Sequence, residues 1–194
     1  MTKEEILPLL AVEVGREKEM RELTEETMRG EIPFVTSFLS RIDILKNIPI
    51  TKVKRIIDSV QLNECMVEFI RNNSDICYVV TGNLDVWIDE LMKKIGIVVN
   101  HCFCSTTSTE NGRVKSVNSV VNKELVIKQF VKPVVAVGDG SNDADMAKFA
   151  KIGIGFGGVR TIAKPLLDCA TYAFHDEKKL VEFLNELKEK GVLL

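Results

Sequence analysis

Two aspartates and an asparagine (Asp139, Asn142 and Asp143) stand together on a glycine-flanked segment in the second half of the chain. Residues 138–143 read Gly-Asp-Gly-Ser-Asn-Asp and follow the apolar run 133–137. Glycines let a backbone approach a bound group closely, and carboxylates held at such a point are suitable ligands for a hard cation such as Mg²⁺. The alternative is an ordinary helix cap, which needs one Asp or Asn rather than three. The segment is therefore a candidate Mg²⁺ site.

A second polar segment follows another apolar run. Residues 76–80 are rich in β-branched and aromatic side chains and lead into Thr81, Gly82 and Asn83. A hydroxyl and free backbone N–H groups at a strand end, next to a helix N-terminus, suit a phosphate oxygen. A Thr-Gly turn after a strand is also common, so the functional interpretation depends on the spacing to the Asp139 segment.

A lysine between these two segments would complete a phosphate-binding set. Lys123 opens a predicted helix, and its ammonium group could lie against the same pocket and neutralise phosphate. Lys115 and Lys128 are alternatives. Each of the three, taken alone, also fits an ordinary solvated surface lysine.

Strands and helices alternate after residue 64. Apolar runs rich in β-branched residues predict buried strands, and periodic apolar residues between them predict helices. The alternation indicates an α/β domain with a mostly parallel sheet, in which ligands bind beyond the carboxyl ends of the strands. The dipeptide Asn111-Gly112 predicts a hairpin turn. The predicted strands cover residues 76–80, 97–99, 102–105, 133–137 and 152–156, and the predicted helices cover 64–71, 86–95, 123–130, 143–150 and 180–190.

The first 60 residues predict helices only. Thr2 and Glu5 have the S/T-x-x-E spacing of a capping box at the start of a helix. Gly30 is a typical C-terminal cap for a second helix, and two further helical segments follow. We therefore expect a small all-helical domain at 1–60 and an α/β domain at 61–194.

The composition excludes several classes of protein. The 194 residues carry 26 Lys and Arg against 28 Asp and Glu, so no basic excess indicates nucleic-acid binding. No stretch approaches the roughly 20 apolar residues of a membrane span, and no signal peptide is recognisable. The five cysteines are odd in number and lie mostly in apolar runs, which favours reduced thiols and a cytoplasmic protein. Cys102 and Cys104 lack the further Cys or His residues that a zinc site needs.

Together, the three polar signals resemble the haloacid dehalogenase-like (HAD) superfamily. Its pattern is a D-x-D-x-T strand, a strand ending in Ser or Thr, a Lys, and an acidic loop. Thr81, Lys123 and residues 138–143 match the last three. The G-D-G-x-N-D form is similar to that of the phosphoserine phosphatase group, which carries a small cap between its first and second motifs. The resemblance implies an α/β fold with a HAD-type, Rossmann-like, mostly parallel sheet and a small all-helical cap.

Four residues of the helical block match positions at which that group contacts its substrate. The resemblance implies that Glu5 meets the substrate ammonium and that Arg41 meets its carboxylate. Met28 and Phe34 would line the pocket. These roles suit the residues because Arg offers a planar fork to a carboxylate and Glu offers a negative charge to an ammonium. The alternative assigns the same four residues to helix core, a helix cap and a solvated surface charge.

The first motif of the family is absent from this sequence. In the family its first aspartate attacks phosphorus and helps to hold Mg²⁺, and its second is the general acid/base. Its strand lies in the middle of the sheet, between the strands that end here at Thr81 and Asp139, so the usual central first strand is expected to be absent too. A mis-set start, a genuine truncation and a partner chain that supplies the strand all account for this. Exposed strand edges invite such a partner.

The resemblance implies a Mg²⁺-dependent phosphomonoesterase for a small phosphorylated substrate of the phosphoserine type, weak or inactive for lack of the nucleophile. Asp139 would ligate the metal, and Asp143 would support its coordination shell and join Thr81 and Lys123 in the catalytic set. Gly82 and Asn142 would bind the phosphoryl group with them. The alternative is a non-catalytic phosphate-binding or phosphoserine-binding regulatory protein. It would be completed by a strand-donating partner or by self-association.

Overall fold

The computed structural model describes residues 1–193, and its strands form two separate three-stranded sheets. In the first sheet, β1 (Val79–Leu84) runs parallel to β2 (Cys102–Glu110), and β2 is antiparallel to β3 (Arg113–Ser119). The predicted hairpin turn joins β2 to β3, and its two residues, Asn111 and Gly112, have φ values of 51° and 71°. This left-handed conformation is the one that a tight hairpin turn requires.

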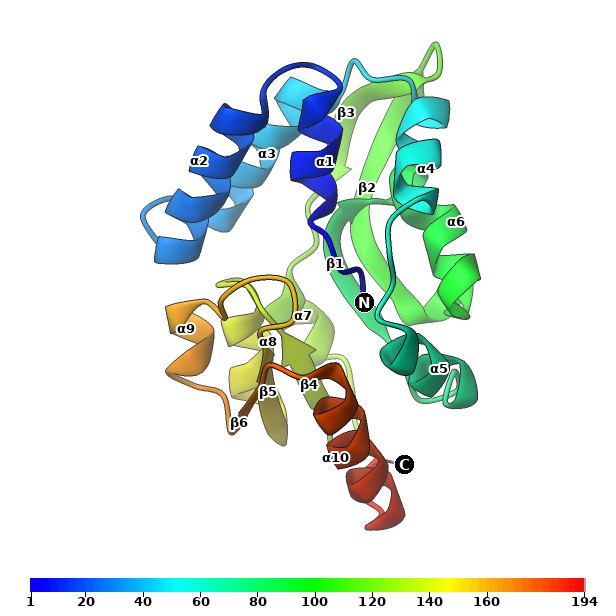
Figure 1. Ribbon diagram of the computed structural model, residues 1–194, viewed down its shortest axis with the longest axis vertical. Helices are drawn as coiled ribbons and strands as arrows, with labels where there is room; N and C mark the ends of the chain where they lie inside the picture. Colours follow the sequence, from blue (N-terminus) through cyan, green and yellow to red (C-terminus); the bar gives the residue numbers. More distant parts are fainter. Residues whose placement is uncertain (194) are drawn as a thin grey trace.

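The second sheet is entirely parallel. It consists of β4 (Val135–Gly138), β5 (Ile152–Phe156) and β6 (Tyr172–Phe174) in that order. Among the described residues, β1 and β4 each pair on one side only. The strands β1 and β4 do not pair with each other, and residues of both line one cavity. Figure 1 shows the two sheets as separate upper and lower bodies.

Five helices precede the first sheet in the described residues, and the first four of them do not all belong to one layer. The helix α2 ends at Gly30, which has a φ of 78°. In Figure 1, α2 and α3 stand together at the upper left, while α4 lies beside α6 on the opposite side. The bounds are α1 (Ile6–Val12), α2 (Glu17–Arg29), α3 (Phe34–Leu45), α4 (Ile50–Asp58) and, after β1, α6 (Asp85–Ile95).

The other helices cover the second sheet and tie it to the first. Contacts join α8 to both β4 and β5, and α10 to α5. At the latter junction the Met66 backbone N–H donates to Glu177 Oε1 at 2.9 Å. No helix of residues 1–193 is long and apolar enough to cross a membrane. The bounds are α5 (Glu64–Asn72), a 3₁₀ turn at Val99–His101, α7 (Lys123–Ile127), α8 (Asp143–Phe149), α9 (Lys164–Leu167) and α10 (Glu177–Glu189).

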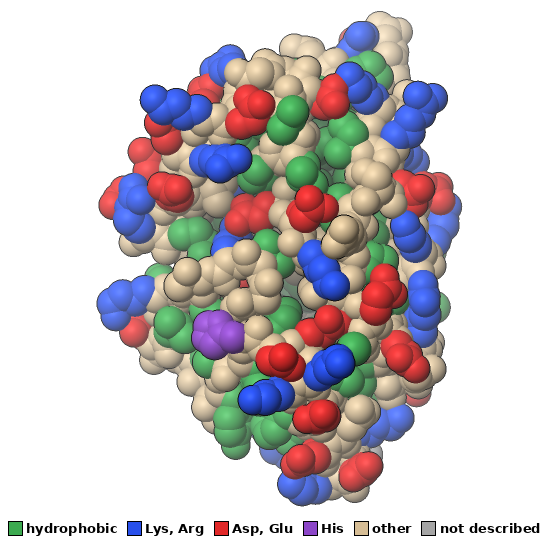
Figure 2. All heavy atoms as spheres, viewed as in Figure 1, with side chains coloured by type: hydrophobic (Ala, Val, Ile, Leu, Met, Phe, Trp, Pro, Cys, Tyr) green, Lys and Arg blue, Asp and Glu red, His purple; other side chains and the backbone are tan. Residues whose placement is uncertain are grey.

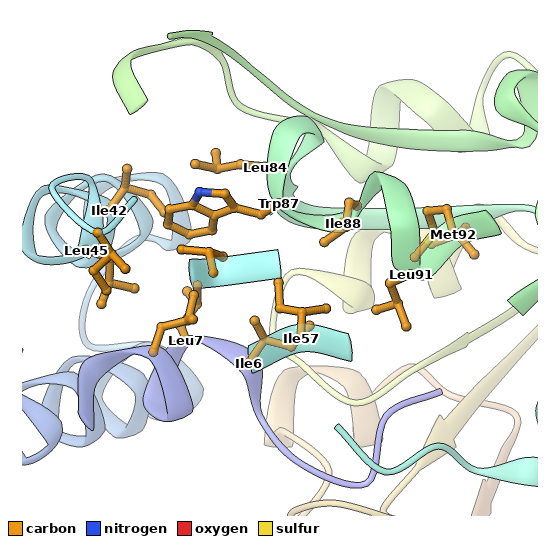
Figure 3. Packing of buried hydrophobic residues seen from close by; sticks show 14 of the residues in the cluster. Ile6, Leu7, Ile42, Leu45, Ile57, Leu84, Trp87, Ile88, Leu91 and Met92 are labelled. Carbon is orange, nitrogen blue, oxygen red and sulfur yellow. The ribbon is translucent and has the colours of Figure 1, made fainter. Parts of the chain in front are cut away.

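The largest hydrophobic core joins the N-terminal helices to the first sheet. Trp87 is 1% exposed and packs in one cluster with Leu7 of α1 and Leu45 of α3, as Figure 3 shows. Burying a side chain of this kind contributes about 1.5–3 kcal/mol to stability. A separate, smaller core around Ile154 and Leu180 holds the second sheet against α5 and α10. Helices α1, α3 and α4 are thus attached to the first sheet through this core.

No strand forms at the predicted 97–99, where a 3₁₀ turn at Val99–His101 is found instead. Two further local predictions are wrong. Thr2 and Glu5 do not form a capping box, because Glu5 makes no side-chain cap hydrogen bond and Thr2 forms a β-bridge with Leu62. The strand predicted at 76–80 is displaced to β1, so Thr81 lies inside a strand with an irregular register rather than in the loop after it. In both cases a partner distant in sequence determines the backbone.

Candidate active site

The acidic loop is organised around the buried carboxylate of Asp143. Asp143 Oδ2 accepts the backbone N–H groups of Asp139 and Gly140 at 3.0 and 2.9 Å, and Oδ1 accepts Lys123 Nζ at 2.5 Å. The side chains of Lys123 and Asp143 are 11% and 5% exposed. A buried carboxylate requires such donors and a cation to stay charged. Asp143 therefore fixes the loop and positions Lys123.

The two glycines of the loop are required by close packing. A Cβ on Gly138 would lie 2.3 Å from Asp143 Cγ, and a Cβ on Gly140 would lie 2.7 Å from Asn142 Oδ1. Any side chain at either position would push the carboxylate or the amide away from its place. The Ser141 hydroxyl donates to the Thr27 carbonyl oxygen at 3.1 Å, so the loop is also tied to helix α2 above it.

The competing lysines lie elsewhere. Lys115 pairs with Glu110 at 2.8 Å, and Lys128 pairs with Glu124. All four of these side chains are between 37% and 58% exposed. Of the three lysines considered from the sequence, Lys123 alone is placed against the acidic loop.

Thr81 lies on β1 opposite the acidic loop. Its Oγ1 accepts the Asn83 backbone N–H at 3.2 Å, which leaves the hydroxyl hydrogen available to a ligand. Ser105 Oγ donates to the Gly82 carbonyl oxygen at 2.8 Å and holds this part of β1 in place. A Cβ on Gly82 would lie 2.7 Å from Phe34 Cζ, so the cap residue Phe34 sits directly on the glycine of the second motif.

Arg41 is a buried guanidinium that faces the same cavity. It is 8% exposed. Its hydrogen bond is to the Ser37 carbonyl oxygen of its own helix at 3.3 Å, and no carboxylate of residues 1–193 forms an ion pair with it. Burial, and after it the charge of Arg160, lowers the pKa of Arg41 to about 10, with Glu5 acting in the opposite direction. Arg41 is therefore charged at neutral pH and forms no ion pair within residues 1–193. A buried, unpaired guanidinium of this kind suits an anionic ligand.

One cavity of about 1010 Å³ brings the candidate residues together. This volume lies at the upper end of the usual range for small-molecule sites, about 300–1,000 Å³. The structure does not place Met28 in the lining. The candidates that do line it are Glu5, Phe34, Arg41, Thr81, Gly82, Lys123, Asp139, Asn142 and Asp143.

The sequence did not indicate Arg160 as a site residue. In the structure Arg160 links Asp139 of the acidic loop to Glu5 at the start of α1. Arg160 Nε donates to Asp139 Oδ2 at 2.6 Å, and Nη1 pairs with Glu5 Oε1 at 3.1 Å. Burial acts to lower the pKa of Arg160, but the Asp139 and Glu5 carboxylates raise it above its ordinary value. The only sequence signal was an arginine after two glycines at the end of a strand, which has no specific meaning.

The oxygen donors of the loop fit a partial magnesium site. Within residues 1–193, no three His, Cys, Asp or Glu side chains gather closely enough to hold a metal ion by themselves. Both oxygens of Asp143 already accept hydrogen bonds, so Asp139 provides the carboxylate that could coordinate a cation. Mg²⁺ is commonly held by one or two carboxylates together with substrate phosphate and water. Asp139 at the lining of this cavity fits that arrangement.

The site is thus an acidic loop after the parallel strand β4, with residues of β1 and of the N-terminal helices lining the same cavity. Residues 11–148 match the family model of the haloacid dehalogenase-like hydrolases. The chain therefore belongs to the haloacid dehalogenase-like hydrolase family.

Within this family, the chain is similar to phosphoserine phosphatases. It is 28% identical to that of Methanocaldococcus jannaschii over 203 residues, which cover 97% of this chain and 93% of the relative. It is 33% identical to that of Archaeoglobus fulgidus over 171 residues, covering 80% of this chain but only 49% of the relative. The chain thus spans about half the length of this second relative.

Solved structures give the same result. A structure described as a phospho-aspartyl intermediate analogue of phosphoserine phosphatase superposes with a TM-score of 0.75 at 26% identity, covering 92% of this chain and 91% of that one. A phosphoserine phosphohydrolase-like protein from Francisella tularensis superposes with a TM-score of 0.78 at 18% identity, covering 94% of each chain. The second match supports the fold alone.

Proposed function

We propose that the cavity is a Mg²⁺-dependent phosphomonoester site for a small phosphorylated amino acid of the phosphoserine type. The observation that carries this proposal is the buried guanidinium of Arg41, which forms no ion pair within residues 1–193 and lines the same cavity as Thr81, Lys123 and Asp139. A ligand with a carboxylate at one end and a phosphate at the other matches this distribution of charge.

Each charged group of phosphoserine has a counterpart in the cavity. Arg41 would bind the carboxylate through its planar fork, and Glu5 would accept the ammonium group. The phosphate would lie against Lys123 and the Thr81 hydroxyl, with the Gly82 backbone and the Asn142 amide around it. Phe34 would close the apolar side of the pocket above Gly82.

The chain's own residues position and neutralise the phosphoryl group. Asp139 would hold the cation, which when bound stabilises negative charge on the phosphoryl oxygens. Asp143 would keep Lys123 and the loop backbone in place. The 194 residues contain no D-x-D-x-T, so they lack the aspartate that would attack phosphorus and the one that would transfer protons. We therefore expect these residues alone to bind phosphoserine with little or no turnover.

The experiment measures phosphate release from O-phospho-L-serine with Mg²⁺ by three proteins. They are the chain itself, a form extended at its N-terminus by an apolar strand ending in D-x-D-x-T, and the same extension with both aspartates changed to asparagine. Turnover by the aspartate form alone is expected. Equal activity in all three would mean that another residue performs the chemistry.

A second candidate function follows from the unpaired edges of β1 and β4. Both edges line the cavity, and an unpaired edge is a template for a further strand. We propose as the alternative a non-catalytic phosphoserine-binding protein that a strand from a partner or from a second copy completes. Hydrogen exchange with and without an apolar strand peptide tests this, because binding should protect the amides of β1 and β4. Unchanged exchange at both strands would argue against it.

We also propose a cellular compartment for the protein and a division of the chain into two parts. The five cysteines form no disulfide, which suits a reducing compartment such as the cytoplasm. Residues 1–60 would act as the cap and 61–194 as the core. Limited proteolysis, which would cut preferentially near residue 60 if the two parts open independently, tests that boundary.

A further inference from the structure

One guanidinium occupies both carboxylates that the proposed function assigns to cations. Arg160 Nε binds Asp139 Oδ2 at 2.6 Å, and Arg160 Nη1 pairs with Glu5 Oε1 at 3.1 Å. Asp139 belongs to the acidic loop, and Glu5 stands at the start of helix α1. In the proposed function Asp139 takes Mg²⁺ and Glu5 takes the substrate ammonium. Arg160 therefore stands in for two different ligands at once.

The side chain of Arg160 can leave this position while its backbone stays in place. It is 28% exposed, so a path to solvent exists. The Ala163 backbone N–H donates to the Asp139 carbonyl oxygen at 2.9 Å and anchors the segment after Arg160 to the acidic loop. Arg41 also lies close enough for repulsion between the two guanidinium charges, which disfavours movement of Arg160 deeper into the pocket. Withdrawal toward solvent is the open direction.

We propose that Arg160 is a positioning residue that couples the metal site to the ammonium site. In this structure the guanidinium of Arg160 neutralises the Asp139 and Glu5 carboxylates together. A cation that binds Asp139 would displace Arg160 Nε from that carboxylate. The contact between Arg160 Nη1 and Glu5 would then be the only one left of the two, and an ammonium group would replace it more easily. Because both ligands need the same displacement, each should bind more tightly in the presence of the other. This inference rests on the proposed function.

The experiment measures Mn²⁺ affinity by electron paramagnetic resonance, with and without L-serine, which supplies an ammonium group and cannot be hydrolysed. Mn²⁺ prefers oxygen ligands as Mg²⁺ does. In the unaltered protein, L-serine should tighten Mn²⁺ binding several-fold. In Arg160→Gln, Mn²⁺ should bind about tenfold more tightly without L-serine, and L-serine should then have no further effect.

Two further variants separate coupling from bulk charge. Arg160→Lys keeps the positive charge but replaces the planar fork by a single ammonium nitrogen, so the effect of L-serine should fall in it as well. Arg29→Gln removes an equally charged side chain that pairs with Glu31 on the surface, and it should behave like the unaltered protein. Asp139→Asn should abolish Mn²⁺ binding and so assigns the signal to this site.

The outcomes distinguish this inference from the proposed function. Mn²⁺ binding that depends on Asp139 but responds to L-serine equally in Arg160→Gln and the unaltered protein would overturn the coupling and leave the metal site standing. Absence of Mn²⁺ binding in every protein would overturn the metal site and the coupling together. Loss of the L-serine effect in Arg160→Gln and a smaller effect in Arg160→Lys, with Arg29→Gln unchanged, is the result expected.

Discussion

Replacement of Arg41 by methionine should stabilise the folded protein and at the same time weaken its affinity for phosphoserine. Arg41 is 8% exposed and has no carboxylate partner among the described residues. Such a buried charge is retained at the expense of stability. Methionine has a similar length and can fill the same space beside Phe34 and Phe38 without carrying a charge.

The magnitude follows from the pKa of Arg41, which burial and the Arg160 charge lower from its ordinary value to about 10. A difference of about 2.5 between the unfolded and folded pKa values corresponds to about 3 kcal/mol, since each pKa unit is worth about 1.4 kcal/mol. Replacing buried charges by apolar residues of similar volume stabilises proteins by about 1–4 kcal/mol. We therefore expect Arg41→Met to raise the free energy of unfolding by about 1–3 kcal/mol.

Urea unfolding at pH 7 measures this change, and Arg55→Met on the exposed face of α4 is the matched control. The control should change the free energy of unfolding by less than about 0.5 kcal/mol. Because the folded pKa of Arg41 is the lower one, the unfolded state binds more protons between about pH 10 and 12.5. The stability gap between Arg41→Met and the unaltered protein should therefore narrow as pH rises through about 10. A loss of stability in Arg41→Met would refute the view that Arg41 is an unpaired charge held for a ligand.

Three further changes test the acidic loop and β1. Lys123→Met leaves the Asp143 carboxylate buried without its cation and should lower the free energy of unfolding by about 3 kcal/mol, measured in urea. Gly138→Ala places a Cβ 2.3 Å from Asp143 Cγ, so it should lower stability by about 1–3 kcal/mol, and an unchanged unfolding midpoint would show that the loop is not tightly packed. Thr81→Val should weaken phosphoserine binding about tenfold by calorimetry, whereas Thr81→Ser, which keeps the hydroxyl, should not.

Local features of this fold could be predicted from the sequence because nearby residues determine them. The acidic loop is specified by an apolar strand, two close-packed glycines and the start of a helix, all within about a dozen residues. The Asn111-Gly112 hairpin is equally local. The absence of the central strand could be predicted as well, since its motif is missing from the sequence. Among the described residues, β1 and β4 do not pair with each other, and both line one cavity.

Features that depend on distant partners could not be predicted in the same way. Thr2 and Glu5 matched a capping box, but Leu62 and Arg160 supply stronger partners from elsewhere in the chain. Arg160 itself carries no periodic or motif signal, so its bridge to Glu5 became visible only in three dimensions.

Met28 shows a second kind of limit. Helix α2 turns Thr27 toward α3, where its hydroxyl bonds Ser37 Oγ at 2.5 Å. The next residue along a helix points about 100° away, and Met28 is not in the cavity lining. Its role as a pocket residue therefore stays a prediction without support from the geometry.

Calorimetric titration of the chain with three phosphate compounds in the presence of Mg²⁺ tests the central claim most directly. O-phospho-L-serine carries a carboxylate and an ammonium group, phosphoethanolamine lacks the carboxylate, and 3-phosphoglycerate lacks the ammonium. If Arg41 and Glu5 recognise those two groups, phosphoserine should bind at least about tenfold more tightly than either analogue, a difference of about 1.4 kcal/mol. Equal affinity for all three, or no binding of phosphoserine, would contradict the assignment of this cavity as a phosphoserine site.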